Sequence, residues 1–265
     1  MTRYPKITVV TPSLNQGEFL EQTILSVLEQ NYKNLEYIVI DGGSQDSSVE
    51  IIKKYEKYLA YWITEKDNGQ AEAIAKGFRH ATGEILAWLN SDDQYCPDAL
   101  QTVGQYFCQN PEVDLLYGDY YLLYPDGKHK LKKKIDFDYA IALYCYLMIP
   151  QPSAFWRRTI YDAVGGMDIS LSYAMDYDLF LRIACLGRVE HFKHPLSVFR
   201  LHSQSKSVAH SDRFAEENSL VQKKHLPESL LRSPFFYLKR YFLLLKTVIL
   251  FFCQRGMIVY KKEQV

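Results

Sequence analysis

The sequence predicts an α/β fold, in which helices flank a mostly parallel sheet. Short apolar runs rich in β-branched residues alternate with segments of helical periodicity from Ile7 to Leu89. Each of these apolar runs is followed closely by a short polar loop. Because ligands of doubly wound sheets bind beyond the carboxyl ends of the strands, we expect the chemistry in those loops.

The predicted elements follow one another in strand and helix order along the first half. Strands are expected at 7–10, 37–40, 61–64 and 85–89, and helices between them over 19–28, 47–55 and 71–78. Beyond Pro97 the pattern loosens. Residues 115–130 are typical of a hairpin with its turn at 124–127, residues 177–186 of a helix and residues 196–201 of a strand.

Composition excludes several classes of function. With 31 basic and 31 acidic residues, the chain has no net positive charge that would attract nucleic acid. Its cysteines have neither zinc-site spacing nor a plausible disulfide framework, which fits a reducing cytoplasm. The first residues contain no apolar signal-peptide core, so no export is expected. The five cysteines are Cys96, Cys108, Cys145, Cys185 and Cys253.

Four polar loops should converge on one rim of the sheet, at residues 11–15, 41–44, 67–70 and 90–93. Neither GxGxxG nor GxxxxGK[ST] occurs, so an anionic ligand must be neutralised by something other than a glycine-rich phosphate loop. Asp92 and Asp93 follow a buried strand and offer hard oxygen ligands to Mg²⁺ or Mn²⁺. Such an ion could bridge a diphosphate and stabilise it as a leaving group.

These loops resemble those of the family 2 glycosyltransferases, which have the GT-A fold, a single Rossmann-like domain that binds a nucleoside diphosphate sugar. The resemblance covers about residues 7–207. It implies a GT-A domain over 1–225, with a nucleotide-sugar half at 1–117 and an acceptor half at 118–225. An amphipathic helical extension follows at 226–265. The nucleotide contacts implied by the resemblance are Thr11, Pro12, Asn15, Asp41, Asp67, Gln70 and Asp92, with Asp41 at the base and Asp92 at the ribose.

The resemblance also implies the metal ligands. Asp93 is expected at the metal, and His202, in the late segment 199–207, is expected at the metal or the diphosphate. Two positions depart from the family pattern: a glycine follows Asp41 where a second acid is common, and Asn90 stands where an outer aspartate is common.

A sugar hydroxyl needs a carboxylate to accept its proton as the new bond forms. Residues 174–179 resemble the family's Glu-Asp motif, in which Asp176 aligns with the catalytic aspartate and Met175 replaces the glutamate. One base and one in-line attack would invert the anomeric carbon. Gln151 and Trp156, with Met175, are expected in the pocket for the acceptor and the donor sugar.

Each residue alone has an ordinary alternative: Asp176 could cap its helix, and His202 could be structural. Two other functions compete. A sugar nucleotidyltransferase would need a basic glycine-rich loop after the first strand, and residues 11–17 contain no basic residue. A catalytically silent scaffold would keep the fold, and Asn90 and Met175 leave that alternative open.

The most apolar stretch, residues 234–253, includes Lys239, Arg240 and Lys246 and is a poor membrane span. It is expected either to lie in a membrane interface or to pack on the catalytic domain or a second subunit. The expected function is inverting transfer from a UDP-sugar to a glycan or lipid-linked acceptor, with Mn²⁺ or Mg²⁺, in bacterial surface polysaccharide synthesis. The expected location is the cytoplasm, with or without peripheral contact to the cytoplasmic face of the membrane.

Overall fold

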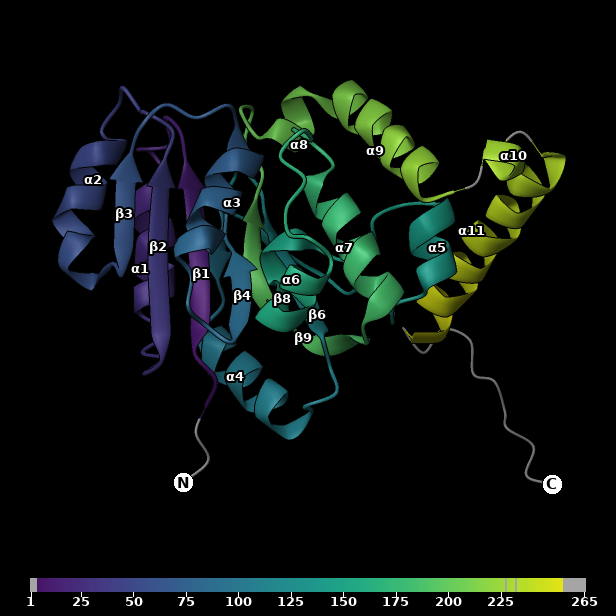
Figure 1. Cartoon of the computed structure of the whole chain (residues 1–265), viewed down its shortest axis with the longest axis horizontal. Coiled ribbons are helices and arrows are strands. Elements are labelled where there is room, and N and C mark those ends of the chain that lie inside the picture. Colours follow the sequence, from purple (N-terminus) through teal and green to yellow (C-terminus); the bar gives the residue numbers. More distant parts are fainter. Residues whose placement is uncertain (1–3, 227, 232, 255–265) are drawn as a thin grey trace.

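A computed structural model describes residues 4–226, 228–231 and 233–254, so residues 255–265 of the expected C-terminal extension lie outside it. Its strands form a single sheet, with helices on both faces (Figure 1). The strand order across the sheet is β3 (Tyr61–Thr64), β2 (Leu35–Asp41), β1 (Ile7–Ser13), β4 (Ile85–Trp88), β8 (Ala154–Arg157), β6 (Leu115–Leu123), β9 (Val189–Arg200) and β5 (Gln94–Tyr95), with β7 (His129–Lys132) paired to β6.

The strands predicted in the first half form the parallel part of this sheet. β3, β2, β1 and β4 run parallel, whereas β8 runs antiparallel to both β4 and β6. The predicted hairpin is β6 and β7, closed by a turn in which the Gly127 amide donates to the Tyr124 carbonyl. β9 begins at Val189, seven residues before the predicted strand, because it pairs along the whole length of β6.

Helices cover the two faces of the sheet because neighbouring strand residues point in opposite directions. Val9 packs toward α1 and α4, and Val10 packs toward α3. Gly77 of α3 lets that helix lie close to β1, since a Cβ there would be 2.4 Å from a Val10 methyl group. The helices are α1 (Leu20–Leu28), α2 (Ser48–Tyr55), α3 (Gln70–His80), α4 (Ala99–Gln109), α5 (Tyr139–Tyr144), α6 (Arg158–Ala163), α7 (Met175–Leu186), α8 (Lys206–Ala209), α9 (Ser211–His225), α10 (Glu228–Leu231) and α11 (Pro234–Gln254).

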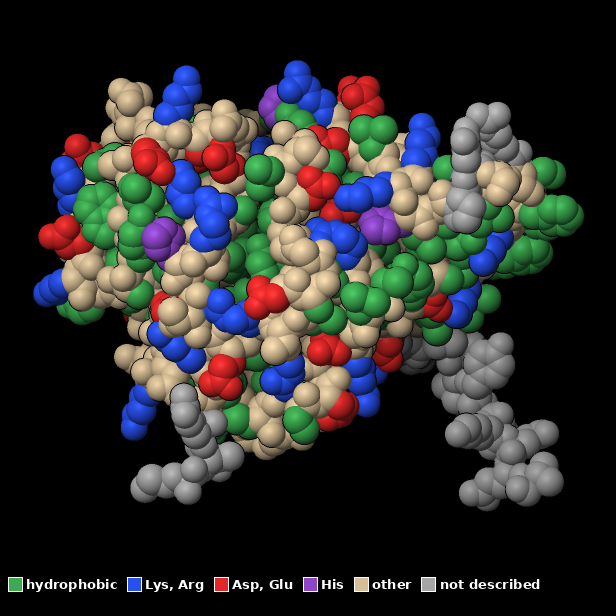
Figure 2. Space-filling view, viewed as in Figure 1, with side chains coloured by type: hydrophobic (Ala, Val, Ile, Leu, Met, Phe, Trp, Pro, Cys, Tyr) green, Lys and Arg blue, Asp and Glu red, His purple; other side chains and the backbone are tan. Residues whose placement is uncertain are grey.

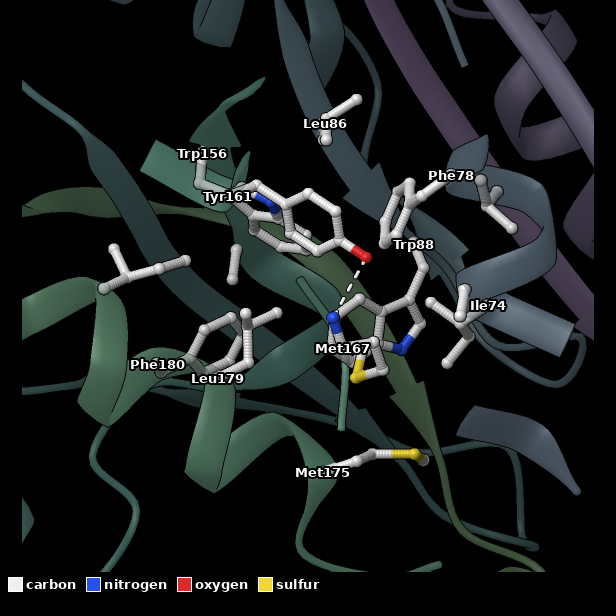
Figure 3. Packing of buried hydrophobic residues seen from close by; sticks show 14 of the residues in the cluster. Ile74, Phe78, Leu86, Trp88, Trp156, Tyr161, Met167, Met175, Leu179 and Phe180 are labelled. Atoms are coloured by element: carbon white, nitrogen blue, oxygen red, sulfur yellow. Dashed lines mark hydrogen bonds between the residues drawn. The ribbon is translucent and has the colours of Figure 1, made fainter. Parts of the chain in front are cut away.

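The core on the α3 side joins the two predicted halves of the domain. Phe78 and Trp88 from the first half pack against Trp156 and Phe180 from the second half, with ring centroids 5.3–6.0 Å apart between the halves (Figure 3). Further along the chain, α5, α7, α9 and α11 share another apolar cluster. The second half is therefore fixed to the first by continuous packing, which holds the loops at the sheet edge in place.

A buried carboxylate ties β1, β2 and the start of β4 together. Glu36 accepts hydrogen bonds from Lys6 Nζ (2.6 Å), Thr8 Oγ1 (2.6 Å) and the Thr82 amide (2.6 Å). Burial opposes ionisation, but these hydrogen bonds outweigh it and lower the pKa of Glu36 to about 2.

We expect Glu36→Gln to lower the free energy of unfolding by about 1–3 kcal/mol at pH 7, since it leaves buried donors poorly paired. Because the folded pKa of Glu36 is lowered, this stabilisation is complete above the unfolded pKa of about 4.5 and is lost as pH falls toward 2. Urea unfolding at several pH values measures it, with the exposed Glu18→Gln as control. Equal stabilities of the two variants at pH 7 would contradict this role.

Candidate active site

A cavity of about 610 Å³ lies beyond the carboxyl ends of β1 and β4, where the sequence places the polar loops. Its walls come from the loops after these strands, the start of α3, the segment 147–152, the entry to α7 and the start of α8. The structure thus brings together segments far apart in the sequence. The predicted site residues that line this cavity are Pro12, Asp67, Gln70, Asp92, Gln151, Met175 and Asp176.

Three predicted nucleotide contacts, Thr11, Asn15 and Asp41, are not among the residues that line the cavity. Asp41 is fully buried, and its carboxylate accepts hydrogen bonds from Ser44 Oγ (2.5 Å), the Ser44 amide (2.9 Å) and Thr64 Oγ1 (2.6 Å). Thr11 is buried with its hydroxyl 3.1 Å from that of Tyr37.

Asn15 has a left-handed backbone (φ 52°), and its side-chain oxygen accepts from the Gln45 amide (2.8 Å). Its own amide donates to Ser44 Oγ (2.8 Å). Asn15 therefore joins the loop after β1 to the loop after β2.

The two neighbouring aspartates after β4 point to different surroundings. Asp92 lines the cavity, and its Oδ2 is 3.0 Å from His202 Nε2. Asp93 is 1% exposed, and its Oδ1 accepts from the Arg200 amide (3.0 Å). Burial, and then the charge of Asp92, raise the pKa of Asp93 well above its ordinary value. The geometry thus departs from the sequence prediction: Asp92, not Asp93, presents a carboxylate to the cavity.

Asp92 and His202 fit a divalent cation that shares its coordination with a substrate. In the part of the chain that the structure describes, no three His, Cys, Asp or Glu side chains converge on one point. Those residues therefore do not by themselves provide a metal site with three or more protein ligands of these types. Mg²⁺ and Mn²⁺ sites built for phosphates commonly use one or two carboxylates, completed by phosphate oxygens and water. A neutral imidazole is a suitable second protein ligand.

Asp176 lines the same cavity from the first turn of α7. Its Oδ1 accepts from the Tyr177 amide (2.8 Å), and burial raises the pKa of Asp176 to about 6. Glu217 of α9 accepts from the amides of Tyr173 (2.7 Å) and Ala174 (2.9 Å) and so fixes the entry to the helix. The N-cap position is Ala174, which contradicts the alternative that Asp176 serves as the N-cap.

The residues predicted to contact sugars divide into two groups. Gln151 lines the cavity, with its Nε2 donating to the Trp88 carbonyl (2.8 Å) and its Oε1 accepting from Asn90 (3.1 Å). Trp156 is 0% exposed, and its ring packs edge-on against Trp88 in the core (Figure 3), whereas Met175 lines the cavity. The predicted sugar contact of Trp156 is therefore wrong.

Two cavity lysines were not predicted from the sequence. Lys206, at the start of α8, donates from Nζ to Gln70 Oε1 (2.8 Å) and lies over the Tyr173 ring. Burial lowers the pKa of Lys206, and the carboxylates of Glu217, Asp67 and Asp92 oppose that effect. Burial also lowers the pKa of Lys134, on the loop after β7, to about 8. Lys206 lies inside the segment 199–207 that also contains His202, and the sequence offers no other signal for it.

Comparison with known proteins decides the family. Residues 8–165 match the family model described as Glycosyl transferase family 2. The chain belongs to this family. It is 31% identical over 186 residues to an uncharacterised glycosyltransferase of Mycobacterium tuberculosis, MT1564, covering 69% of this chain and 71% of that one. The chain is thus a glycosyltransferase, and the resemblance inferred from its motifs is confirmed.

Solved structures confirm the GT-A fold of this family 2 glycosyltransferase. Staphylococcus aureus TarS, in complex with UDP-GlcNAc, superposes with a TM-score of 0.65 at 16% identity over 82% of this chain and 65% of that chain. The mannosyltransferase PcManGT of Pyrobaculum calidifontis, in complex with GDP-Man and Mn²⁺, superposes with a TM-score of 0.61 at 18% identity over 98% of this chain and 82% of that one. At these identities the likeness concerns the fold.

The raised pKa of Asp176 predicts how activity should depend on pH. A general base must be ionised, so kcat/KM should fall about tenfold per pH unit below about pH 6 and level off above it. A profile of kcat/KM from pH 4.5 to 8, compared with nucleotide affinity over the same range, measures this. An inflection near 3.8, where an ordinary aspartate titrates, would contradict the assignment of the base to this partly buried carboxylate.

Proposed function

We propose that this glycosyltransferase moves one sugar from a nucleoside diphosphate sugar, of which a UDP-sugar is the expected form, to an acceptor hydroxyl with inversion. The observation that carries the proposal is a single cavity lined by both Asp176 and Asp92, with His202 Nε2 3.0 Å from Asp92 Oδ2. The nucleotide sugars held by TarS and PcManGT, whose folds match this one, support it.

The donor would lie with its nucleoside near Pro12 and Asp67 and its diphosphate near Asp92. Lys206 would contribute positive charge to the diphosphate from the start of α8. Asp92 and His202 would hold Mn²⁺ or Mg²⁺, which when bound supplies Lewis-acid stabilisation of the leaving diphosphate. Gln151, already oriented by Asn90 and the Trp88 carbonyl, would face the transferred sugar.

Asp176 would act on the acceptor. Its carboxylate takes the proton from the acceptor hydroxyl while the oxygen forms a bond to the anomeric carbon. The bond from that carbon to the diphosphate breaks on the opposite face, so one displacement inverts the configuration. No covalent enzyme intermediate is needed. Burial of Asp176 favours this role, because a base whose pKa is about 6 is mostly ionised at pH 7 and binds a proton better than an exposed aspartate.

The acceptor is proposed to be a glycan or lipid-linked hydroxyl in the assembly of a bacterial surface polysaccharide, at the cytoplasmic face of the membrane. Leu147 and Ile149 give the cavity an apolar margin beside α5, on the side where α11 packs. An apolar margin suits an acceptor that carries a lipid.

Calorimetry with a panel of nucleoside diphosphates tests the donor assignment. We expect UDP to bind in the presence of Mn²⁺ and to bind much more weakly after chelation. If another nucleoside diphosphate binds better, the preference for UDP is wrong but the site stands. If no nucleoside diphosphate binds, the transferase account fails for this chain and a scaffold function is favoured.

Lys206→Met should raise the Kd for UDP by about tenfold and leave the Kd for uridine unchanged. The reason is that the lysine would contact only the diphosphate, where a charge-assisted hydrogen bond contributes about 1.5–3 kcal/mol. Lys66→Met, on the exposed loop after β3, is the matched control. Equal weakening of uridine and UDP would show that Lys206 shapes the pocket instead of binding phosphate.

A further inference from the structure

The outward face of α11 is an apolar surface that the active site does not explain. Among the residues that the structure describes, 15 large hydrophobic side chains are exposed, and 10 of them lie on this one helix. They form the apolar ridge at the right edge of the molecule (Figure 2), far from β3 at the other end (Figure 1). Single exposed hydrophobic residues are ordinary, but a contiguous patch indicates a binding surface.

One face of α11 is packed against the domain and another is exposed, and the residues of each face recur at helical spacing. Phe236, Leu243 and Leu250 recur every seven residues and pack into the cluster with α5 and α7. Leu238, Leu245 and Phe252 follow each of these by two positions, which places them about 200° around the helix, and they are 39–50% exposed. The helix therefore packs with one apolar face and leaves a second apolar face uncovered.

The three charged side chains of α11 lie at its border with the rest of the domain and not on the outward face. The Arg240 charge lies near Cys145, at the end of α5, and near Tyr177 of α7. Lys246 Nζ pairs with Asp138 Oδ2, at 2.5 Å, and Lys239 Nζ lies 4.3 Å from the centre of the Tyr144 ring. Both lysines thus reach toward α5, at the border between α11 and the rest of the domain. Basic residues along the border of an apolar face are the arrangement found in helices that lie in a membrane interface.

The charge of this part of the sequence indicates the partner. From residue 229 to residue 262 there are seven lysines and arginines and no acidic residue, although the whole chain has 31 of each sign. Anionic lipid headgroups attract such a segment, whereas pairing α11 with a second copy would bring two like-charged segments together. Electrostatics therefore favours an anionic membrane over a dimer.

We propose that α11 lies parallel to an anionic bilayer, with its outward face among the acyl chains and its basic border at the headgroups. No helix among the described residues is long and apolar enough to cross a membrane, so the helix would lie in the interface. This membrane contact does not depend on the donor site. It would also bring the apolar margin of the cavity, next to α5, close to lipid.

Vesicle flotation of the full chain tests the proposal. We expect the protein to float with vesicles of phosphatidylethanolamine and phosphatidylglycerol and to stay behind with vesicles of phosphatidylcholine alone. Leu245→Glu should reduce the bound fraction by about tenfold or more, because it places a charge in the middle of the buried face. Tyr58→Glu is the matched control, since Tyr58 is 55% exposed, against 45% for Leu245, and lies on another part of the surface.

UDP binding and the thermal midpoint of Leu245→Glu should equal those of the native chain, which separates loss of membrane contact from loss of fold or of the donor site. Light scattering of the native chain and the variant measures the oligomeric state in parallel. A native dimer that becomes monomeric in Leu245→Glu, with no flotation of either, would overturn the proposal in favour of a second copy. Equal flotation of Leu245→Glu and the native chain would also overturn it.

Discussion

Asp176→Asn should lower kcat by about 10²–10⁴ while the Kd for UDP stays within about twofold of the native value. The amide has the size of the carboxylate but cannot take a proton from the acceptor. Because burial already disfavours the ionised form of Asp176, the neutral amide should not destabilise the fold. Initial rates of sugar transfer, together with UDP calorimetry and a thermal midpoint, measure the three quantities.

Asp126→Asn, in the exposed turn of the hairpin between β6 and β7, is the control for the loss of one negative charge. It should leave transfer unchanged. A loss of less than tenfold in kcat for Asp176→Asn would show that another group accepts the proton. A loss of UDP affinity as large as the loss in kcat would show that Asp176 supports the donor site instead of the chemistry.

The second large effect is expected on metal-dependent UDP binding, when Asp92 or its neighbour Asp93 is replaced. Asp92→Asn should abolish the dependence of UDP affinity on Mn²⁺ and lower kcat/KM by about 10²–10⁴, the several kcal/mol that a metal supplies to a leaving group. Asp93→Asn should keep the metal dependence, since the buried Asp93 favours its neutral form and an amide oxygen can still accept from the Arg200 amide.

The comparison of these two variants decides between the prediction from sequence and the arrangement in the structure. Calorimetric titration of UDP into each variant, with Mn²⁺ and with chelator, is sufficient. If Asp93→Asn loses the metal response and Asp92→Asn keeps it, then Asp93 leaves its buried position when the donor binds. The original assignment of the metal to Asp93 would then be right.

The parallel half of the sheet could be predicted because its information is local. β1, β2 and β4 are buried on both faces, so each reads as a continuous apolar run that ends at a polar loop. The second half could not be predicted in the same way, because β6 pairs with β8 and β9, which lie far along the chain. In β9, Glu190, Lys193 and Pro195 also interrupt any alternating pattern.

The residues of the candidate active site also fall into those that the sequence identified and those that it did not. Asp92, Gln151 and Asp176 were found because each stands in a motif, and the structure places all three on one cavity. Trp156 was misplaced because its face depends on register: opposite Leu86 and Leu115, its side chain points into the core. Lys206 was missed because a single lysine has no spacing pattern, and its role depends on where α8 begins.

The most direct test of the account is a crystal structure of the chain with UDP and Mn²⁺, with the metal located by its anomalous scattering. We expect one manganese peak held by Asp92 and His202, with the diphosphate beside it and Asp176 lining the same cavity as the donor. Nucleotide bound elsewhere, or manganese at a site that involves neither Asp92 nor His202, would contradict the account.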